Sequence, residues 1–405
     1  MENKIEIMAP AGNFESLAAA IKSGADSVYF GIEQLNMRAR SANNFRISDL
    51  KKIVSICNEK NIKTYITVNT IIYDHDIELM KKIIDAAKEN NVTAIIASDI
   101  STIQYAYEKG VEIHISTQCN ISNVESVKFY SKFADVIVLA RELTLSQVKH
   151  ICDEIKKQNI KGPKRELIKI ELFAHGALCT AISGVCYMSL STYNSSANRG
   201  ACMQNCRRSY RVIDEETGEE LVLENNYIMS PKDLCTIAFL DKLIDVGVKV
   251  FKIEGRGRSA DYVYTVVKSY KDAVNSILDG TYSKEKVDNW TKELESVFNR
   301  GFWNGGYYLG KKLGEWSGAY GNQSTKEKFF VGVAKHYFSK ARVGEFEIQK
   351  DDLKIGDEII ITGDTTGVVK TKVNEMYVND SRNDIAKKGD VVTIKVPERV
   401  REKDK

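Results

Sequence analysis

The sequence lacks the features of a membrane or exported protein. None of its 405 residues falls in a run of roughly 18 uninterrupted apolar residues, the length of a membrane-spanning helix. The first ten residues, MENKIEIMAP, have neither the basic flank nor the apolar core of a signal peptide. We therefore expect a cytoplasmic protein with no membrane partner. Cytosolic thiols stay reduced, so its eight cysteines are expected to bind metal or to react rather than to form disulfides.

Several enzyme signatures are also missing. No G-x-G-x-x-G follows the first predicted strand, which weakens the case for a dinucleotide-binding sheet. No H-E-x-x-H or G-x-S-x-G is present, so a metallopeptidase or serine hydrolase would lack its usual motif. The net charge of +3 is too small to indicate nucleic-acid binding by itself, but it does not exclude a local basic face.

The sequence does contain a repeated pattern of short β-branched runs, each followed by an amphipathic stretch. The eight runs begin near Ile5, Asp26, Lys63, Ala94, Glu112, Asp135, Glu166 and Val248. Strict alternation predicts a parallel sheet. Eight units within about 280 residues favour a closed (β/α)8 TIM-like barrel over an open sheet.

The chain divides into four predicted parts. Residues 1–282 form the α/β barrel, with a cysteine-rich insertion at about 176–235 after strand seven. Residues 283–325 form a connector, first helical and then rich in aromatic residues and glycine. Residues 326–398 alternate with a period of two around Gly-Asp turns and predict a small C-terminal all-β barrel. Residues 399–405 are read as a frayed basic tail.

In a barrel of this kind the chemistry lies on the loops after the strand C-termini. Candidate residues at these positions are Arg38, Asn69, Gln118, Arg141, Glu142, His175, Lys252, Glu254 and Arg256. Arginine binds anions through two parallel hydrogen bonds, so the KIEGRGR stretch predicts an anion site; the alternative is that Lys252 and Glu254 pair inside the barrel mouth. His175 is read as a base or ligand, with a purely hydrogen-bonding role as the alternative.

Four cysteines crowd into one glycine- and serine-rich stretch. Cys179, Cys186, Cys202 and Cys206 are spaced C-x6-C-x15-C-x3-C, and Cys235 follows 29 residues later. Thiolates are the usual ligands of iron–sulfur clusters and structural zinc. Structural zinc sites favour short knuckles, so the irregular spacing favours a [4Fe–4S] cluster, with zinc less favoured and no metal as the third alternative.

A basic stretch overlaps these cysteines. It carries Arg199, Arg207, Arg208 and Arg211, with Tyr210 among them. Arginines with an interleaved aromatic residue suit contacts to an RNA backbone and its bases. The competing interpretation is an ordinary solvated run of charges.

The segment ELFAHGALCTAISGVCYMSLS resembles the signature of the peptidase U32 (collagenase-like) family. The matching positions are Glu171, Phe173, Gly176, Ala177, Leu178, Cys179, Gly184, Cys186 and Ser189. The blocks MAPAGN, NMRARSANNF, NRGACMQNCR, SPKDLC and KIEGR also look like family blocks. The resemblance therefore covers the barrel and extends over the whole chain.

The resemblance implies a function in RNA modification. Members with an NRGxCxxxCR block and a C-terminal β extension take part in O2-independent hydroxylation of tRNA, which makes 5-hydroxyuridine at the wobble position. By motif position the implied [4Fe–4S] ligands are Cys179, Cys186, Cys202 and Cys235, with Cys206 as the substitute for Cys202. Prephenate is the implied hydroxyl donor, tRNA the implied partner, and a second U32 protein a further candidate partner.

These observations lead to one working hypothesis and two alternatives. Arg38, Arg141 and Arg256 would hold the anionic donor, while Asn69, Gln118, Glu142 and His175 would orient groups or move protons. A flipped-out uridine would enter beside the cluster, and the β domain would hold the tRNA body. The alternatives are a collagenase-like peptidase and a non-enzymatic RNA-binding scaffold whose metal is structural.

Overall fold

Eight parallel strands close into the predicted barrel. The computed structural model describes residues 4–40, 42–221, 227, 229–310, 315–319 and 321–405. The barrel strands are β1 (Glu6–Pro10), β2 (Ser27–Gly31), β3 (Lys63–Val68), β4 (Ala94–Ala97), β5 (Glu112–Ile115), β6 (Val136–Val138), β7 (Lys169–Gly176) and β11 (Val250–Ile253). They pair in sequence order, and β11 pairs with both β1 and β7, which closes the ring.

A helix follows each barrel strand, although the cysteine-rich insertion separates the seventh strand from its helix. These helices are α1 (Phe14–Lys22), α2 (Leu50–Asn58), α3 (Ile77–Glu89), α4 (Ile100–Glu108), α5 (Val124–Tyr130), α6 (Leu145–Lys157), α8 (Leu240–Asp245) and α9 (Ala260–Leu278). In α2 the buried residues Leu50, Ile53, Val54 and Cys57 fall on one helical face, so the apolar spacing fixes which side faces the strands. Asn13, Asp99 and Asn123 cap α1, α4 and α5 through their side chains.

Short 3-10 turns complete the loops. They are η1 (Ile47–Asp49), η2 (Asp74–Asp76), η3 (Thr117–Cys119), η4 (Ala197–Arg199), η5 (Asn205–Arg207), η6 (Ile237–Phe239) and η7 (Tyr307–Leu309).

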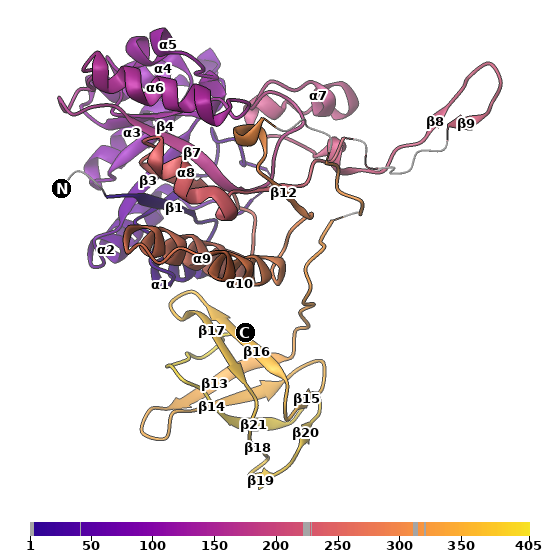
Figure 1. Cartoon of the computed structure of the whole chain (residues 1–405). Coiled ribbons are helices and arrows are strands. Elements are labelled where there is room, and N and C mark those ends of the chain that lie inside the picture. The colour runs from indigo at the N-terminus through magenta and orange to yellow at the C-terminus, as the bar shows by residue number, and fades with distance from the viewer. Residues whose placement is uncertain (1–3, 41, 222–226, 228, 311–314, 320) are drawn as a thin grey trace.

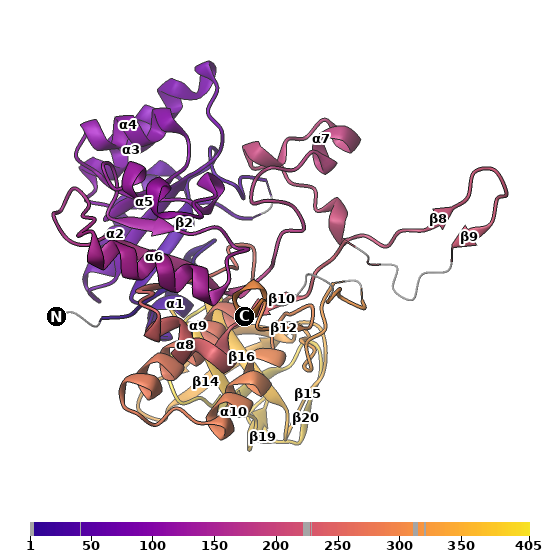
Figure 2. The ribbon, with the colours of Figure 1, turned by 45° about the horizontal axis from the view of Figure 1, so that its top comes forward.

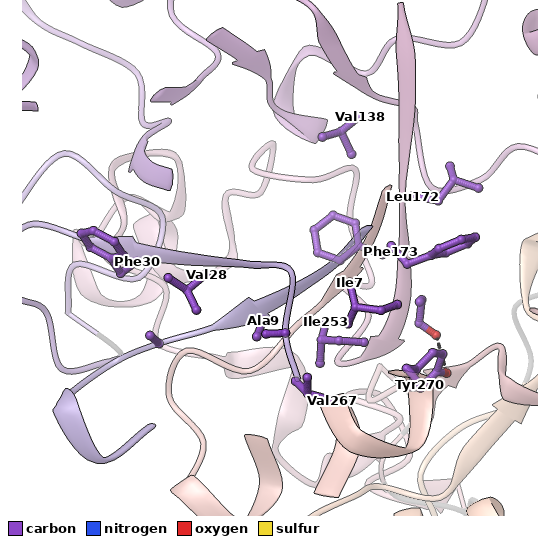
Figure 3. Close-up of a cluster of buried hydrophobic side chains, with 14 of the residues drawn as sticks. Ile7, Ala9, Val28, Phe30, Val138, Leu172, Phe173, Ile253, Val267 and Tyr270 are labelled. Atoms are coloured by element: carbon purple, nitrogen blue, oxygen red, sulfur yellow. Dashed lines mark hydrogen bonds between the residues drawn. The ribbon is translucent and has the colours of Figure 1, made fainter. Parts of the chain in front are cut away.

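The main hydrophobic core lies between the barrel and its helices. Figure 3 shows Ile7 and Ala9 of β1 and Ile253 of β11 beside Val267 and Tyr270 of α9, and all five are buried. Burying apolar surface of this kind is the dominant favourable term in folding. Cys57 and Cys152 belong to this core, as their helical positions predict.

The barrel interior also holds charged side chains. The Lys252 ammonium donates to Glu171 Oε1 at 3.1 Å. His114 Nδ1 lies 3.6 Å from Glu171 Oε2, and His114 Nε2 lies 3.7 Å from Glu112 Oε1. Burial alone would raise the pKa of the Glu171 carboxyl, but Lys252 and His114 outweigh it and the pKa is lowered. Glu171 therefore remains ionised because its partners are buried with it.

The insertion after β7 leaves the barrel at its C-terminal rim. We call residues 176–211 the cysteine loop; it contains α7 (Met188–Tyr193). A hairpin of β8 (Val212–Ile213) and β9 (Glu220–Leu221) projects away from the barrel (Figure 2). Residues 222–226 and 228, which follow this hairpin, lie outside the described residues. The chain then returns in β10 (Asp233–Cys235), which pairs antiparallel with the end of β7.

The connector packs against the barrel before the C-terminal domain begins. It forms α10 (Lys284–Glu295) and then β12 (Phe302–Asn304), which pairs parallel with β10. Trp303 and Tyr308 are buried, and the Tyr308 hydroxyl donates to the Phe173 carbonyl at 3.0 Å. The aromatic residues of the connector thus extend the wall of the barrel beside β7.

The C-terminal domain consists of antiparallel sheets around a second core. Its strands are β13 (Gly332–Phe338), β14 (Val343–Ile348), β15 (Leu353–Lys354), β16 (Glu358–Gly363), β17 (Gly367–Lys372), β18 (Met376–Val378), β19 (Ser381–Arg382), β20 (Ile385–Ala386) and β21 (Val391–Lys395). The domain sits on the flank formed by α1 and α9 (Figure 1). There the Lys22 ammonium donates to the Val368 carbonyl at 2.7 Å.

The last residues do not fray as the sequence predicts. Val400 and Asp404 are buried, and the Lys405 N–H donates to the Thr362 carbonyl at 2.8 Å. The tail therefore completes the β domain. Among the described helices, none combines the length and apolarity that crossing a membrane requires.

The buried charges predict a large stability effect at Lys252. Lys252→Met removes the cation that is hydrogen-bonded to buried Glu171, so the free energy of unfolding should fall by about 3–5 kcal/mol. The Lys252→Met/Glu171→Leu double variant should recover most of this loss. Guanidinium unfolding followed by circular dichroism measures both. Lys149→Met, which breaks the exposed Lys149–Asp153 pair of α6, is the control and should cost under about 1 kcal/mol. Equal losses for Lys252→Met and Lys149→Met would contradict the account of the barrel interior.

A cysteine-lined cationic pocket at the barrel rim

A cavity of about 220 Å³ lies at the C-terminal ends of the barrel strands, beneath the cysteine loop. Most of the predicted site residues line it: Arg38, Asn69, Gln118, Arg141, Arg207, Lys252, Glu254, Arg256, Cys179, Cys186, Cys202 and Cys206. Four predicted residues, Glu142, His175, Arg199 and Cys235, are not among the lining residues. The pocket also contains Tyr29, Arg258 and Arg300, which sequence reasoning did not select.

Glu254 organises the cations on one wall. Arg38 Nη2 lies 2.6 Å from Glu254 Oε1, and the Tyr29 hydroxyl lies 3.4 Å from Glu254 Oε2. Burial would raise the pKa of the Glu254 carboxyl, but Arg38, with Arg141 and Arg256 nearby, lowers it to about 2. Glu254 is therefore ionised and paired with Arg38, whereas Lys252 pairs with Glu171. Lys252 and Glu254 thus have separate partners.

Arg256 is held inside the barrel mouth by neutral oxygens. Its Nη1 donates to Asn36 Oδ1 and to Thr67 Oγ1, both at 3.0 Å. Burial lowers the pKa of the Arg256 guanidinium to about 10, so it is still a cation at neutral pH. No carboxylate is hydrogen-bonded to it within the described residues, so its charge is available to an anion in the pocket.

Arg141 has an unused donor. Its guanidinium lies over the Phe173 ring, 4.2 Å from the centroid. Within the described residues its buried Nε has no hydrogen-bond partner. A buried N–H without an acceptor is costly, and a bound oxygen anion would relieve that cost.

Two amides, those of Asn69 and Gln118, also line the pocket. Asn69 Nδ2 lies 3.2 Å from both Ser116 Oγ and Gln118 Oε1, and Asn69 Oδ1 accepts the Met37 N–H at 3.3 Å. Ser116 Oγ also donates to Gln118 Oε1. These contacts fix the direction of both amides, and amides are the groups that recognise base edges.

Four cysteines of the cysteine loop line this pocket. Cys179 and Cys186 come from the segment after β7, Cys202 lies between η4 and η5, and Cys206 lies in η5. Burial raises the pKa of the Cys206 thiol, Arg207 opposes the shift, and Cys179, Cys202 and Cys186 add to it. In the part of the chain that the structure describes, no three His, Cys, Asp or Glu side chains form a group that could hold a single metal ion.

A β-bulge moves His175 out of the pocket. Along β7, Phe173 pairs with Lys252 but His175 pairs with Ile253, so Ala174 is the extra residue. The bulge reverses the alternation of side chains and turns His175 to the outer face, where its Nδ1 lies 3.4 Å from the Tyr270 hydroxyl. Burial lowers the pKa of the His175 imidazole to about 3, so it is neutral at physiological pH.

Cys235 shares this outer site. It pairs with His175 in the β10–β7 ladder, and the Tyr270 hydroxyl lies 3.9 Å from its sulfur. Burial raises the pKa of the Cys235 thiol to about 11, so it remains protonated at neutral pH. Within the described residues the structure therefore groups Cys206, and not Cys235, with the other three thiols of the pocket.

Two arginines predicted to bind substrate make contacts within the protein that hold the cysteine loop in place. Arg199 makes a double contact with Asp76, at 2.6 and 3.2 Å, and lies over the Tyr73 ring at 4.0 Å. Arg207 lines the pocket but donates to the carbonyls of Leu178 and Pro231, the latter at 2.7 Å. The guanidinium groups of Arg199 and Arg207 are therefore largely occupied by hydrogen bonds within the protein.

The remaining predicted residue, Glu142, is exposed and lies outside the lining of the pocket.

The backbone of the cysteine loop packs closely against the loop after β2 at Gly200. Gly200 has φ +77°, and a Cβ there would lie 2.1 Å from the Asn36 carbonyl oxygen. Only glycine fits this contact between the cysteine loop and the loop after β2.

The fold and the site define a class: a (β/α)8 barrel with a cysteine-rich loop over a cationic rim pocket. The sequence profile of peptidase family U32 matches residues 12–318. The chain belongs to peptidase family U32, which confirms the resemblance seen in the cysteine segment.

Three relatives show the range of names within this family. A protein of Porphyromonas gingivalis named collagenase is 58% identical over 403 residues, 100% of this chain and 97% of that protein. tRNA hydroxylation protein P1 of Bacillus subtilis is 30% identical over 372 residues, 89% of this chain and 84% of that protein. The 23S rRNA 5-hydroxycytidine C2501 synthase of Escherichia coli is 31% identical over 397 residues, 96% of this chain but 55% of that protein.

The anchoring contacts predict a local effect at Arg199. Arg199→Ala should release the cysteine loop because Asp76 and Tyr73 lose their partner. Hydrogen–deuterium exchange should then be faster in peptides covering 195–206, with little change in the barrel strands. Arg211→Ala, which removes an exposed partner of Glu220 in the hairpin, is the control and should leave these peptides unchanged. Unaltered exchange in Arg199→Ala would show that the pair does not hold the loop.

Proposed function

We propose that this chain is an RNA hydroxylase that binds a [4Fe–4S] cluster on Cys179, Cys186, Cys202 and Cys206. The observation that carries the proposal is that these four thiols face a pocket whose other charged lining residues are six arginines, Lys252 and Glu254. The target is the C5 position of a pyrimidine, and specifically the wobble uridine of tRNA. The product is 5-hydroxyuridine.

The residues present fit such a cluster. Thiolates are its usual ligands, and the cluster places each thiolate on a different iron, so the four sulfurs need not converge on one ion. Four thiolates give the loaded site a net negative charge. Arg207 faces Cys206 and Cys179, and Arg38 faces Cys202, so cations already oppose that charge. The cluster would supply one-electron chemistry next to the reacting base.

The pocket residues supply binding and orientation. The unpaired Nε of Arg141 and the cation of Arg256 suit the carboxylates of an anionic donor such as prephenate. The fixed amides of Asn69 and Gln118 suit the edge of a pyrimidine. Arg38 and Glu254 neutralise each other and hold the floor of the pocket in one arrangement. His175 and Glu142 lie outside the pocket, so we assign them no part in the chemistry.

The names of two relatives support RNA as the substrate. tRNA hydroxylation protein P1 and 23S rRNA 5-hydroxycytidine C2501 synthase are both at least 30% identical to this chain, and both names describe hydroxylation of RNA. The E. coli name specifies the 5-position of cytidine. A pocket with cations for a donor and amides for a base suits the same class of reaction.

The 58% identical relative named collagenase makes a peptidase the second candidate. A cysteine peptidase needs a base next to its thiol. No histidine is among the described residues that line the pocket, and its one carboxylate, Glu254, is paired with Arg38 at a pKa of about 2. The site therefore supports hydroxylation better than peptide hydrolysis.

Serine variants of the cysteines test the ligand set. Cys179→Ser, Cys186→Ser, Cys202→Ser and Cys206→Ser should each lose the brown colour and most of the iron after anaerobic reconstitution. Cys235→Ser should retain both, because its side chain lies behind β7 with Tyr270. Cys119→Ser is the control for an unrelated thiol. Retained iron in Cys206→Ser together with loss in Cys235→Ser would instead support the ligand set implied by motif position.

Isotope labelling tests the reaction. Purified protein, unmodified tRNA and prephenate labelled with ¹⁸O at its hydroxyl are incubated without O2, and the nucleosides are analysed by mass spectrometry. The label should appear in 5-hydroxyuridine, and the donor should take up the displaced C5 hydrogen and the two electrons that uridine loses. Arg141→Met should raise the KM for prephenate roughly tenfold to a hundredfold, because one charge-assisted contact is lost. Label entering from ¹⁸O-water would contradict the proposed donor. Collagen cleavage by the same preparation without nucleoside hydroxylation would favour the peptidase.

A further inference from the structure

The cysteine loop contains no acidic residue. Residues 176–211 hold four arginines and neither aspartate nor glutamate, although the whole chain has 55 acidic residues among 405. Solvated loops usually mix both signs of charge, so a surface segment with one sign indicates an anionic partner.

Three of these arginines are bound to carboxylates or to backbone carbonyls, whereas Arg208 contacts an exposed tyrosine. Arg199 is bound to Asp76, and Arg207 donates to backbone carbonyls. Arg211 pairs with Glu220. Arg208 is different: its guanidinium lies 5.2 Å from the centroid of the Tyr193 ring and donates to the Tyr193 hydroxyl. This pair offers a cation and an aromatic face at the same place.

A second tyrosine stands at the pocket mouth. Tyr187 is 73% exposed, and its neighbours in the chain, Cys186 and Met188, both line the pocket. Tyr193, at the other end of α7, is 43% exposed. The helix rise separates the two residues by roughly 9 Å along its axis, and the turn of roughly 100° per residue places them about 120° apart around it, so they offer two separate stacking positions. Large aromatic side chains left exposed beside a binding pocket mark an interaction surface.

We propose that Tyr187 and the Tyr193–Arg208 pair form a stacking platform for unpaired bases that flank the target nucleotide. The chain would therefore take single-stranded or looped RNA and reject duplex RNA. This inference rests on the proposed function and names the class of RNA that its site accepts. Aromatic rings stack on bases only where the bases are unpaired, and arginine adds contact to phosphate and to base faces.

A second copy of this chain fits the platform poorly. In a twofold contact both copies present the same surface, so the loops of both copies would bring their arginines to one interface without any acidic residue of the loop to balance them. RNA brings the opposite charge and the flat faces that the tyrosines need. The charge and the aromatic residues therefore favour the same partner.

The test is fluorescence anisotropy with the full chain and two labelled RNAs. One is a stem-loop with the sequence of a tRNA anticodon arm, and the other is a duplex made from its stem. Tyr187→Ala and Tyr193→Ala should each weaken binding of the stem-loop roughly tenfold to a hundredfold, with little effect on the duplex. Tyr187→Trp should bind the stem-loop as well as the parent chain does.

Tyr107→Ala is the matched control, because Tyr107 is 47% exposed on α4, toward the opposite end of the barrel. It should bind both RNAs like the parent chain. Parent-level binding of the stem-loop by both Tyr187→Ala and Tyr193→Ala would overturn the platform and leave the proposed function standing. No binding of either RNA by the parent chain would instead count against the proposed function. A change of oligomeric state in Tyr187→Ala with unchanged RNA binding would show that the surface meets protein, which also overturns the platform.

Discussion

The pairing of β11 with both β1 and β7 closes the barrel, and the site depends on that closure. Closure brings the C-terminal ends of all eight strands to one rim, although the residues on them lie far apart in the chain. Arg38 follows β2, Arg141 follows β6 and Arg256 follows β11, yet all three line one pocket. An open sheet would spread these groups along an edge. The cysteine loop then docks on the rim through Arg199 and Gly200, and its thiols join the pocket.

The charges that line the pocket decide which kinds of ligand it can bind. Cationic side chains surround the four thiols, and the one carboxylate in the lining is held by Arg38. Such a pocket favours groups that bring negative charge. Thiolates, carboxylate donors and RNA phosphates all share that property, so one electrostatic environment suits a metal cluster, a small donor and the RNA.

Much of the fold could be predicted from the sequence. The eight strands and their helices follow from local periodicity, since residues such as Leu50, Ile53 and Cys57 repeat at helical spacing and are buried where that spacing predicts. The rim residues follow as well, because any polar residue just after a barrel strand must reach the same end. The change to a period of two after residue 326 indicates the β domain for the same local reason.

The rest depends on contacts that local patterns do not contain. The bulge at Ala174 is a property of the β7–β11 pairing, and it alone sends His175 outward. The antiparallel return of β10 places Cys235 beside His175, and spacing in the sequence gives no sign of that pairing. Arg258 lies in the KIEGRGR stretch and could have been selected with Arg256. Arg300 comes from the connector, which reaches the pocket only through the pairing of β12 with β10. Arg199 looked like a substrate ligand because its partner, Asp76, is distant in the chain.

The central claim is that Cys179, Cys186, Cys202 and Cys206 converge to bind one iron–sulfur cluster at the rim. Its most direct test is Mössbauer spectroscopy on ⁵⁷Fe-labelled protein purified without O2, together with iron and acid-labile sulfide analysis. The account predicts the quadrupole doublets of a [4Fe–4S] cluster, with about four iron and four sulfide per chain. One tightly bound zinc per chain, or iron without sulfide, would contradict it.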